Sequence, residues 1–131
     1  MTDPRQRSVI AVVDDDRRVL ESLENLLDSA NYDVRSFSTG KALLESRGLL
    51  EIDCLISDVA MPLMDGFELA RTVQAVRPGL PVILVTGRPE LLHRAPPDRP
   101  GHYRVFKKPF DGQELLTALA LMLRSSRAPG P

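Results

Sequence analysis

Short apolar runs alternate along this chain with segments in which apolar residues recur every three to four positions. Runs of this kind are typical of strands buried on both faces of a sheet, and the three-to-four spacing is typical of amphipathic helices. Continuous apolar runs predict strands at 8–13, 53–57 and 81–86, an alternating pattern predicts a half-buried strand at 32–37, and a weaker run predicts one at 103–108. We expect helices at 17–30, 40–48 (ended by Gly48), 66–79 and 111–125.

Strands that alternate with helices predict βα units and therefore a parallel sheet. We predict an α/β fold, a flavodoxin-like doubly wound (βα)5 domain with five parallel strands in the order 2-1-3-4-5 and helices on both faces. The 131 residues fit one domain, which we place at 8–124. The remaining ranges, 1–7 and 125–131, are expected to be an N-terminal tail and a C-terminal tail or linker.

Four prolines interrupt the place where the fourth helix of such a fold belongs. Pro89 can begin a helix, because the first turn needs no N–H there. Pro96, Pro97 and Pro100 cannot continue one, since each interior proline costs about 3 kcal/mol. We therefore predict a shortened or missing fourth helix, with a turn near 89–94 followed by an extended, mobile segment to about 102.

Composition excludes several classes of protein. The formal net charge of -1 gives no electrostatic argument for binding nucleic acid or an anionic membrane. No apolar stretch approaches the roughly 20 residues of a membrane span, and no signal peptide is visible. The lone Cys54 excludes a disulfide framework, is expected in the core, and fits a cytoplasmic setting.

Polar side chains follow four of the expected strands, at the edge where ligands bind in such sheets. Three acids in a row, Asp14 to Asp16, follow the first strand, and Asp58 follows the third. Thr86 follows the fourth and Lys108 the fifth. Asp16 is expected to cap the next helix, so the other carboxylates remain for a ligand. Clustered carboxylates without soft ligands favour a hard cation, and Mg²⁺ suits them.

These residues lie in the stretches "VVDDD", "SDVAMPLMDG", "VTG" and "KKPF", and in this combination the chain resembles the receiver domain of two-component response regulators. The resemblance covers about 8–124. It implies a signalling switch rather than a conventional enzyme, catalysing only its own phosphorylation and dephosphorylation. It also implies a sensor histidine kinase or histidine phosphotransfer protein as phosphoryl donor. An output domain or a downstream protein is a further possible partner.

The resemblance also assigns roles to single residues. Asp58 would be the phosphoacceptor, and Asp15 with Asp58 would ligate Mg²⁺ directly. The backbone carbonyl of Ala60 would supply another ligand, and Asp14 would act mostly through a bound water. Thr86 would hydrogen-bond the phosphoryl group and Lys108 would pair with it, with a cis bond before Pro109.

Other functions stay open from sequence alone. A haloacid-dehalogenase-type phosphatase also uses Asp, Mg²⁺, Thr and Lys, and Asp14 with Asp16 mimics its D-x-D pattern. Arg18 stands against this reading, as does the short chain. A pseudo-receiver that never takes phosphate and a phosphate sink in a relay are two further alternatives. A P-loop NTPase is excluded, because no G-x-x-x-x-G-K-[ST] occurs.

Three positions depart from the usual receiver pattern or leave rates undetermined. Val105 stands where receivers carry a switch aromatic, three residues before the lysine, and neither Tyr103 nor Phe106 has that spacing. Ala60 and Arg88 would border the path of the hydrolytic water, and they do not indicate a dephosphorylation rate.

His93 and His102 are expected at the surface and not as metal ligands.

Overall fold

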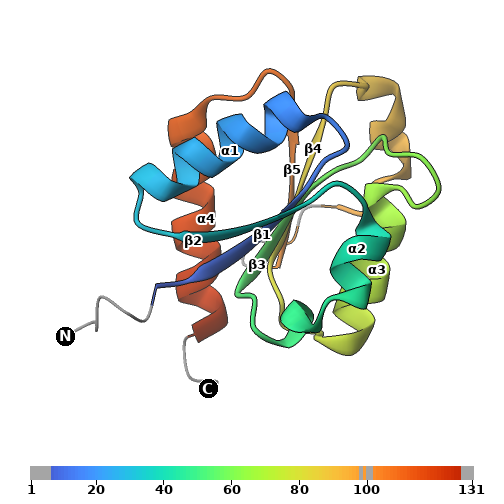
Figure 1. Ribbon diagram of the computed structural model, residues 1–131. Helices are drawn as coiled ribbons and strands as arrows, with labels where there is room; N and C mark the ends of the chain where they lie inside the picture. Colours follow the sequence, from blue (N-terminus) through green and yellow to red (C-terminus); the bar gives the residue numbers. More distant parts are fainter. Residues whose placement is uncertain (1–6, 98, 100–101, 128–131) are drawn as a thin grey trace.

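The computed structural model describes residues 7–97, 99 and 102–127. Five strands form one parallel sheet in the order β2-β1-β3-β4-β5, as the sequence predicts (Figure 1). The strands are β1 (Val9–Val13), β2 (Asp33–Phe37), β3 (Cys54–Asp58), β4 (Val82–Thr86) and β5 (Tyr103–Lys107). The α-helices are α1 (Arg17–Ser29), α2 (Gly40–Glu45), α3 (Gly66–Val76) and α4 (Gly112–Arg127), and the 3-10 helices are η1 (Arg47–Leu50) and η2 (Pro89–Arg94).

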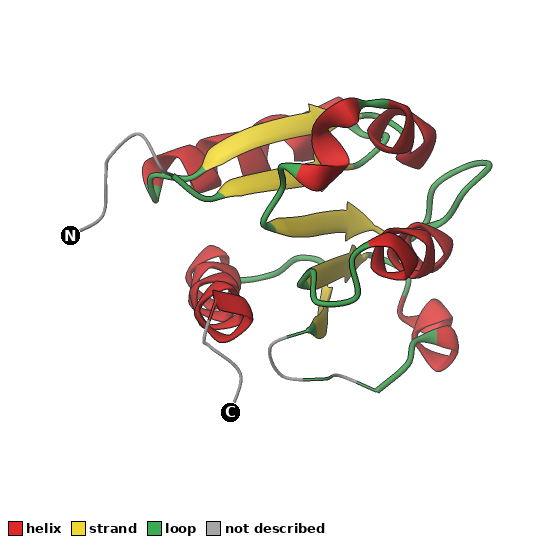
Figure 2. Ribbon diagram, turned by 90° about the horizontal axis from the view of Figure 1, so that it is seen from below, coloured by secondary structure: helices red, strands yellow, loops and turns green. Residues whose placement is uncertain are grey.

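The helices form a layer on each face of the sheet (Figures 1 and 2). Helices α1 and α4 cover one face and bury leucines such as Leu23 and Leu119 against Ile56 and Ile83. Helices α2 and α3 cover the other face, where Leu69 packs with Leu55 and Leu84. Because β1, β3 and β4 lie between two apolar layers, four or all five of their residues are buried, which explains their continuous apolar runs.

Two helix ends differ from the sequence-based expectation. The helix expected at 40–48 ends at Glu45, and Gly48 lies within η1 instead of ending the helix. Ser46 explains the break, since its backbone is extended and its hydroxyl donates to the Leu43 carbonyl and accepts from the Gly48 N–H. The helix expected at 66–79, with a stop at Pro78, ends slightly earlier at Val76, because Pro78 pushes Arg77 out of helical geometry.

The segment after β4 lacks a regular α-helix among its described residues, as the prolines predict. It makes one short 3-10 helix, η2, which ends with Ala95 in an extended conformation directly before Pro96. Part of the segment that we expected to be mobile, residues 98, 100 and 101, lies outside the described residues. Helix α4 begins one residue later and ends two residues later than expected.

None of the helices in the described part of the chain is long and apolar enough to cross a bilayer. Cys54 is buried in the core beside Ile10 and Ile56, as expected. Burial raises the pKa of its thiol, and the neighbouring Asp53 carboxylate raises it further, which makes Cys54 a poor nucleophile.

Candidate functional site

The carboxyl ends of β1 and β3 bring Asp14 and Asp58 together at one edge of the sheet. Each side chain offers a carboxylate oxygen within 4.8 Å of the other and of an oxygen of Asp15. Asp14 and Asp58 are buried, whereas Asp15 is exposed. Three converging hard oxygen donors without His or Cys suit Mg²⁺, so these residues fit the ion that the sequence predicts.

Lys108 connects the two buried carboxylates. Its Nζ donates to Asp14 Oδ2 at 3.1 Å and to Asp58 Oδ1 at 3.0 Å. Strand pairing fixes this position, because the Lys108 N–H donates to the Thr86 carbonyl at 2.7 Å. The bond between Lys108 and Pro109 is cis, as the resemblance implies.

Charge and burial compete in this cluster. Burial raises the pKa of Asp58, the hydrogen bond from Lys108 opposes this rise, and the charge of Asp14 adds to it, so that the pKa lies above its usual value. Burial alone would lower the pKa of Lys108, but the hydrogen bonds and charges of Asp58 and Asp14 outweigh burial and raise it. The ionised form of Asp58 is therefore costly to bury unless cations lie close to its carboxylate.

Asp14 and Asp16 hold the β1–α1 loop in place. Asp14 Oδ1 accepts from the Asp16 N–H at 2.9 Å, and Asp16 Oδ1 accepts from the Arg18 N–H at 2.9 Å at the start of α1. The cap that the sequence predicts at Asp16 is thus confirmed. Asp15 has no hydrogen-bond partner among the residues that the structure describes, so its carboxylate is free to turn towards a ligand.

Thr86 closes β4 and is fully buried. Its hydroxyl accepts from the Arg88 N–H at 3.0 Å and donates to the Arg88 carbonyl at 3.3 Å. The second bond is long, so the hydroxyl hydrogen can be redirected to a better acceptor at modest cost. The Arg88 side chain itself is exposed and pairs with Glu90 at 2.9 Å.

Gly66 and Asp65 matter to the site, although sequence analysis did not select them. A Cβ on Gly66 would lie 2.4 Å from the carbonyl oxygen of Asp58, so only glycine permits α3 to begin this close to the end of β3. Asp65 caps α3 by accepting from the Glu68 N–H at 2.9 Å. The signal was present as "DGFE", an acidic cap residue followed three positions later by Glu.

The remaining predicted residues lie near the cluster or apart from it. Ala60 follows Asp58 by two positions and is half-buried, and the role of its carbonyl as a ligand stays a prediction. Val105 packs on the α2–α3 side of the sheet and Phe106 on the other side. His93 is exposed and His102 half-buried, and neither belongs to the carboxylate cluster.

Comparison with known proteins identifies a family for this arrangement. Residues 10–120 match the family described as response regulator receiver domain. The response regulator protein TmoT of Ectopseudomonas mendocina is 36% identical over 119 residues, which are 91% of this chain and 54% of TmoT. The transcriptional regulatory protein FixJ of Bradyrhizobium diazoefficiens is 32% identical over 89% of this chain and 57% of FixJ. The chain thus spans about half the length of these relatives.

Solved structures give the same result. The signal receiver domain of an HD domain-containing protein from Pseudomonas fluorescens Pf-5 superposes with a TM-score of 0.81 and 31% identity, covering 95% of this chain and all of that chain. The BeF3-activated DrrB receiver domain superposes with a TM-score of 0.74 and 28% identity, covering 91% of this chain and 99% of the other. The chain therefore belongs to the response regulator receiver domain family.

Proposed function

We propose that this domain accepts a phosphoryl group onto Asp58 from a phosphohistidine of a sensor histidine kinase or a histidine phosphotransfer protein. The observation that carries the proposal is the Nζ of Lys108, which lies 3.0 Å from Asp58 and 3.1 Å from Asp14. A cation at hydrogen-bond distance from a buried carboxylate stabilises the negative charge that gathers there during phosphoryl transfer.

The step needs positioning and charge neutralisation more than a strong base. An oxygen of Asp58 forms a bond to phosphorus while the bond between phosphorus and the donor imidazole nitrogen breaks, and the imidazole leaves and takes up a proton. The product is an acyl phosphate. Lys108 pairs with the phosphoryl oxygens, and the Thr86 hydroxyl turns from the Arg88 carbonyl to donate to one of them.

The acidic cluster would hold Mg²⁺ through Asp14, Asp15, Asp58 and the carbonyl of Ala60, with Asp14 acting mostly through water. Bound there, Mg²⁺ would offset charge on the phosphoryl oxygens during transfer. Loss of the phosphoryl group requires a water molecule to attack phosphorus, which returns the Asp58 carboxylate and inorganic phosphate. Under this proposal the domain catalyses only its own phosphorylation and dephosphorylation and acts as a cytoplasmic signalling switch.

Mass spectrometry of the intact protein tests the proposal. With acetyl phosphate and Mg²⁺ the wild type should gain the mass of one phosphoryl group, and EDTA should prevent the gain. The Asp58→Asn variant should gain nothing, whereas Asp53→Asn, a matched change at the opposite end of β3, should behave as the wild type. A phosphoryl group on Asp58→Asn would refute the assignment of Asp58.

A further inference from the structure

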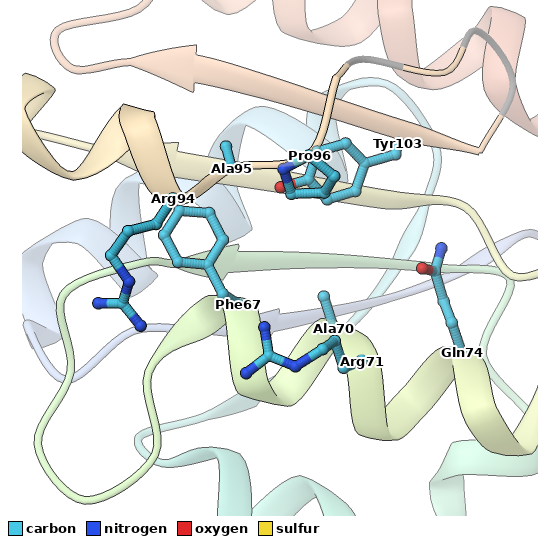
Figure 3. Close-up of a pocket in the computed structure, with 8 residues that line it drawn as sticks. All are labelled: Phe67, Ala70, Arg71, Gln74, Arg94, Ala95, Pro96 and Tyr103. Atoms are coloured by element: carbon cyan, nitrogen blue, oxygen red, sulfur yellow. The ribbon is translucent and has the colours of Figure 1, made fainter.

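A groove with arginines along its length lies between α3 and the segment that follows η2, and none of the three clustered aspartates lines it (Figure 3). We call it the arginine groove and define it by Phe67, Arg71, Gln74, Arg94, Pro96, Arg99 and Tyr103, which line its two adjoining cavities. The cavities have volumes of 320 and 160 Å³ and share Gln74, Pro96 and Tyr103, so they form one continuous depression.

The short η2 and the prolines create this groove. A regular helix after β4 would pack its side chains along α3 and fill this space. Here the backbone becomes extended at Ala95 and continues through two prolines. Proline offers no N–H and has a small apolar side chain. The segment opposite α3 therefore leaves the groove open and contributes an apolar wall. The larger cavity therefore has an apolar floor made by Phe67, Ala70, Ala95 and Tyr103.

The polar groups of the groove are arranged along its length. Figure 3 shows Arg71 and Arg94 towards the Phe67 end and Gln74 at the opposite end. Arg94 is held in place, with its guanidinium 5.4 Å from the centre of the Phe67 ring and 3.0 Å from Asp65 Oδ2. Beyond Gln74, the smaller cavity adds Arg99 and His102.

Among the residues that the structure describes, the charged side chains that line the groove are all arginines. No carboxylate is among the described residues that line either cavity, and Arg71 and Arg99 make no ion pair with any residue in the described part of the chain. Both side chains are exposed. The whole chain has a formal charge of -1, so this cationic strip is a local feature and not a reflection of a basic protein.

From this pattern we propose that the arginine groove binds an acidic segment of a partner protein, in extended form, through one aromatic or large aliphatic side chain with carboxylates on both sides. A cavity of 320 Å³ fits a single large side chain with its backbone. One carboxylate would pair with Arg71 and Arg94, and another with Arg99, in the forked geometry that guanidinium groups favour.

Gln74 adds a contact for the peptide backbone. Its side-chain amide nitrogen already donates to the carbonyls of Leu80 at 3.0 Å and His102 at 3.2 Å, which fixes its orientation. Its amide oxygen then remains as an acceptor for a backbone N–H of the bound segment. A nucleic acid fits less well, because a narrow apolar cavity with arginines spaced around it does not follow a phosphate backbone.

Selection from a random twelve-residue peptide display library against the full 131-residue chain tests this proposal, followed by fluorescence anisotropy with the enriched peptides. We expect peptides with one large apolar residue between acidic residues, and weaker binding at higher salt. In an NMR titration the amides of Phe67, Ala70 and Gln74 should shift. Absence of acidic peptides, or preferred binding of the oligonucleotide dT12 in this groove, would overturn the proposal.

Three variants locate the binding. Arg71→Glu combined with Arg99→Glu should weaken the enriched peptides at least tenfold, and because neither side chain is paired, the fold should be retained. Ala95→Trp fills the larger cavity without altering charge and should weaken binding similarly. Arg124→Glu makes the charge change of one of these two substitutions on α4, on the opposite face, and should leave affinity unchanged. Equal affinity of all variants would contradict the assignment.

Discussion

Asp58 is destabilised in its ionised form when no metal ion is bound. Its pKa is raised, chiefly by burial, so the folded chain holds a proton on Asp58 more tightly than the unfolded chain does. The contribution of Asp58 to stability therefore falls as pH rises from the unfolded pKa of about 3.9 through the higher folded value. At neutral pH the ionised Asp58 thus lowers the free energy of unfolding.

Asp58→Asn should consequently raise the melting temperature in EDTA by a few degrees at pH 7.5, because the asparagine carries no charge to bury. The gain should shrink as pH is lowered, because the raised pKa of Asp58 lets a growing fraction of it bind a proton in the folded wild type. Differential scanning calorimetry with and without Mg²⁺ measures both effects, and Mg²⁺ should stabilise the wild type but not the variant. A lower melting temperature of the variant in EDTA would contradict this electrostatic argument.

Asp14 and Asp15 should differ in their importance for Mg²⁺. Asp14 is already engaged by Lys108 at 3.1 Å and by the Asp16 N–H at 2.9 Å, whereas Asp15 is exposed. Asp15 can therefore turn to ligate the ion directly, while Asp14 reaches it through water. We expect isothermal titration to show a larger loss of Mg²⁺ affinity for Asp15→Ala than for Asp14→Ala, with Asp28→Ala as an unaffected control. The reverse order would refute this division of roles.

At the scale of elements, the contact between β3 and α3 depends on the absence of a side chain at Gly66. Gly66→Ala should lower the free energy of unfolding by about 1–3 kcal/mol, because the new Cβ would overlap the Asp58 carbonyl and α3 would have to shift. Gly79→Ala is the matched control, since its Cβ meets nothing within 4 Å. Urea denaturation measures both, and similar losses at the two glycines would contradict the close-approach explanation.

The elements that the sequence predicts well are those fixed by local physics. Continuous apolar runs identified β1, β3 and β4, while an alternating pattern identified β2 and a weaker run identified β5, each to within one residue at each end. The prolines predicted the loss of a regular helix after β4. The end of α2 was missed because Ser46 breaks the helix through side-chain hydrogen bonds, which a periodicity of apolar residues does not contain. Gly48 is a plausible helix end by composition, but it is reached only after the chain has left α2.

The proximity of Asp14, Asp58 and Lys108 was predictable from the sequence, but their contacts were not. Parallel topology brings strand ends together, which is enough to place Asp14, Asp58 and Lys108 at one edge. Two details depend on distances that only the folded chain defines: Lys108 bridges both acids, and a Cβ on Gly66 would overlap the Asp58 carbonyl. The arginine groove escaped prediction for a related reason, since Arg71, Arg94 and Arg99 share no motif and meet only through packing.

At the scale of the whole molecule, the replacement of a regular fourth helix by the short η2 affects how the domain can dimerise. Receivers commonly dimerise or bind outputs through a face made by the fourth helix, the fifth strand and the fifth helix. Here η2 is short and buries no residue, and Val105 replaces the aromatic side chain that would link this face to Thr86. In the part of the chain that the structure describes, this face has no regular α-helix after β4, and position 105 has no aromatic side chain.

We therefore expect the domain to keep its oligomeric state when it is phosphorylated. Beryllofluoride with Mg²⁺ should mimic the acyl phosphate on Asp58, and light scattering coupled to size-exclusion chromatography should give the same mass with and without it. Asp58→Asn serves as the control that does not respond to beryllofluoride. If the wild type forms a dimer only with beryllofluoride, and Val105→Asp abolishes that dimer, this face does act as a switch. The short η2 must then be extended or replaced in the activated state, because few apolar contacts are available on it as it stands.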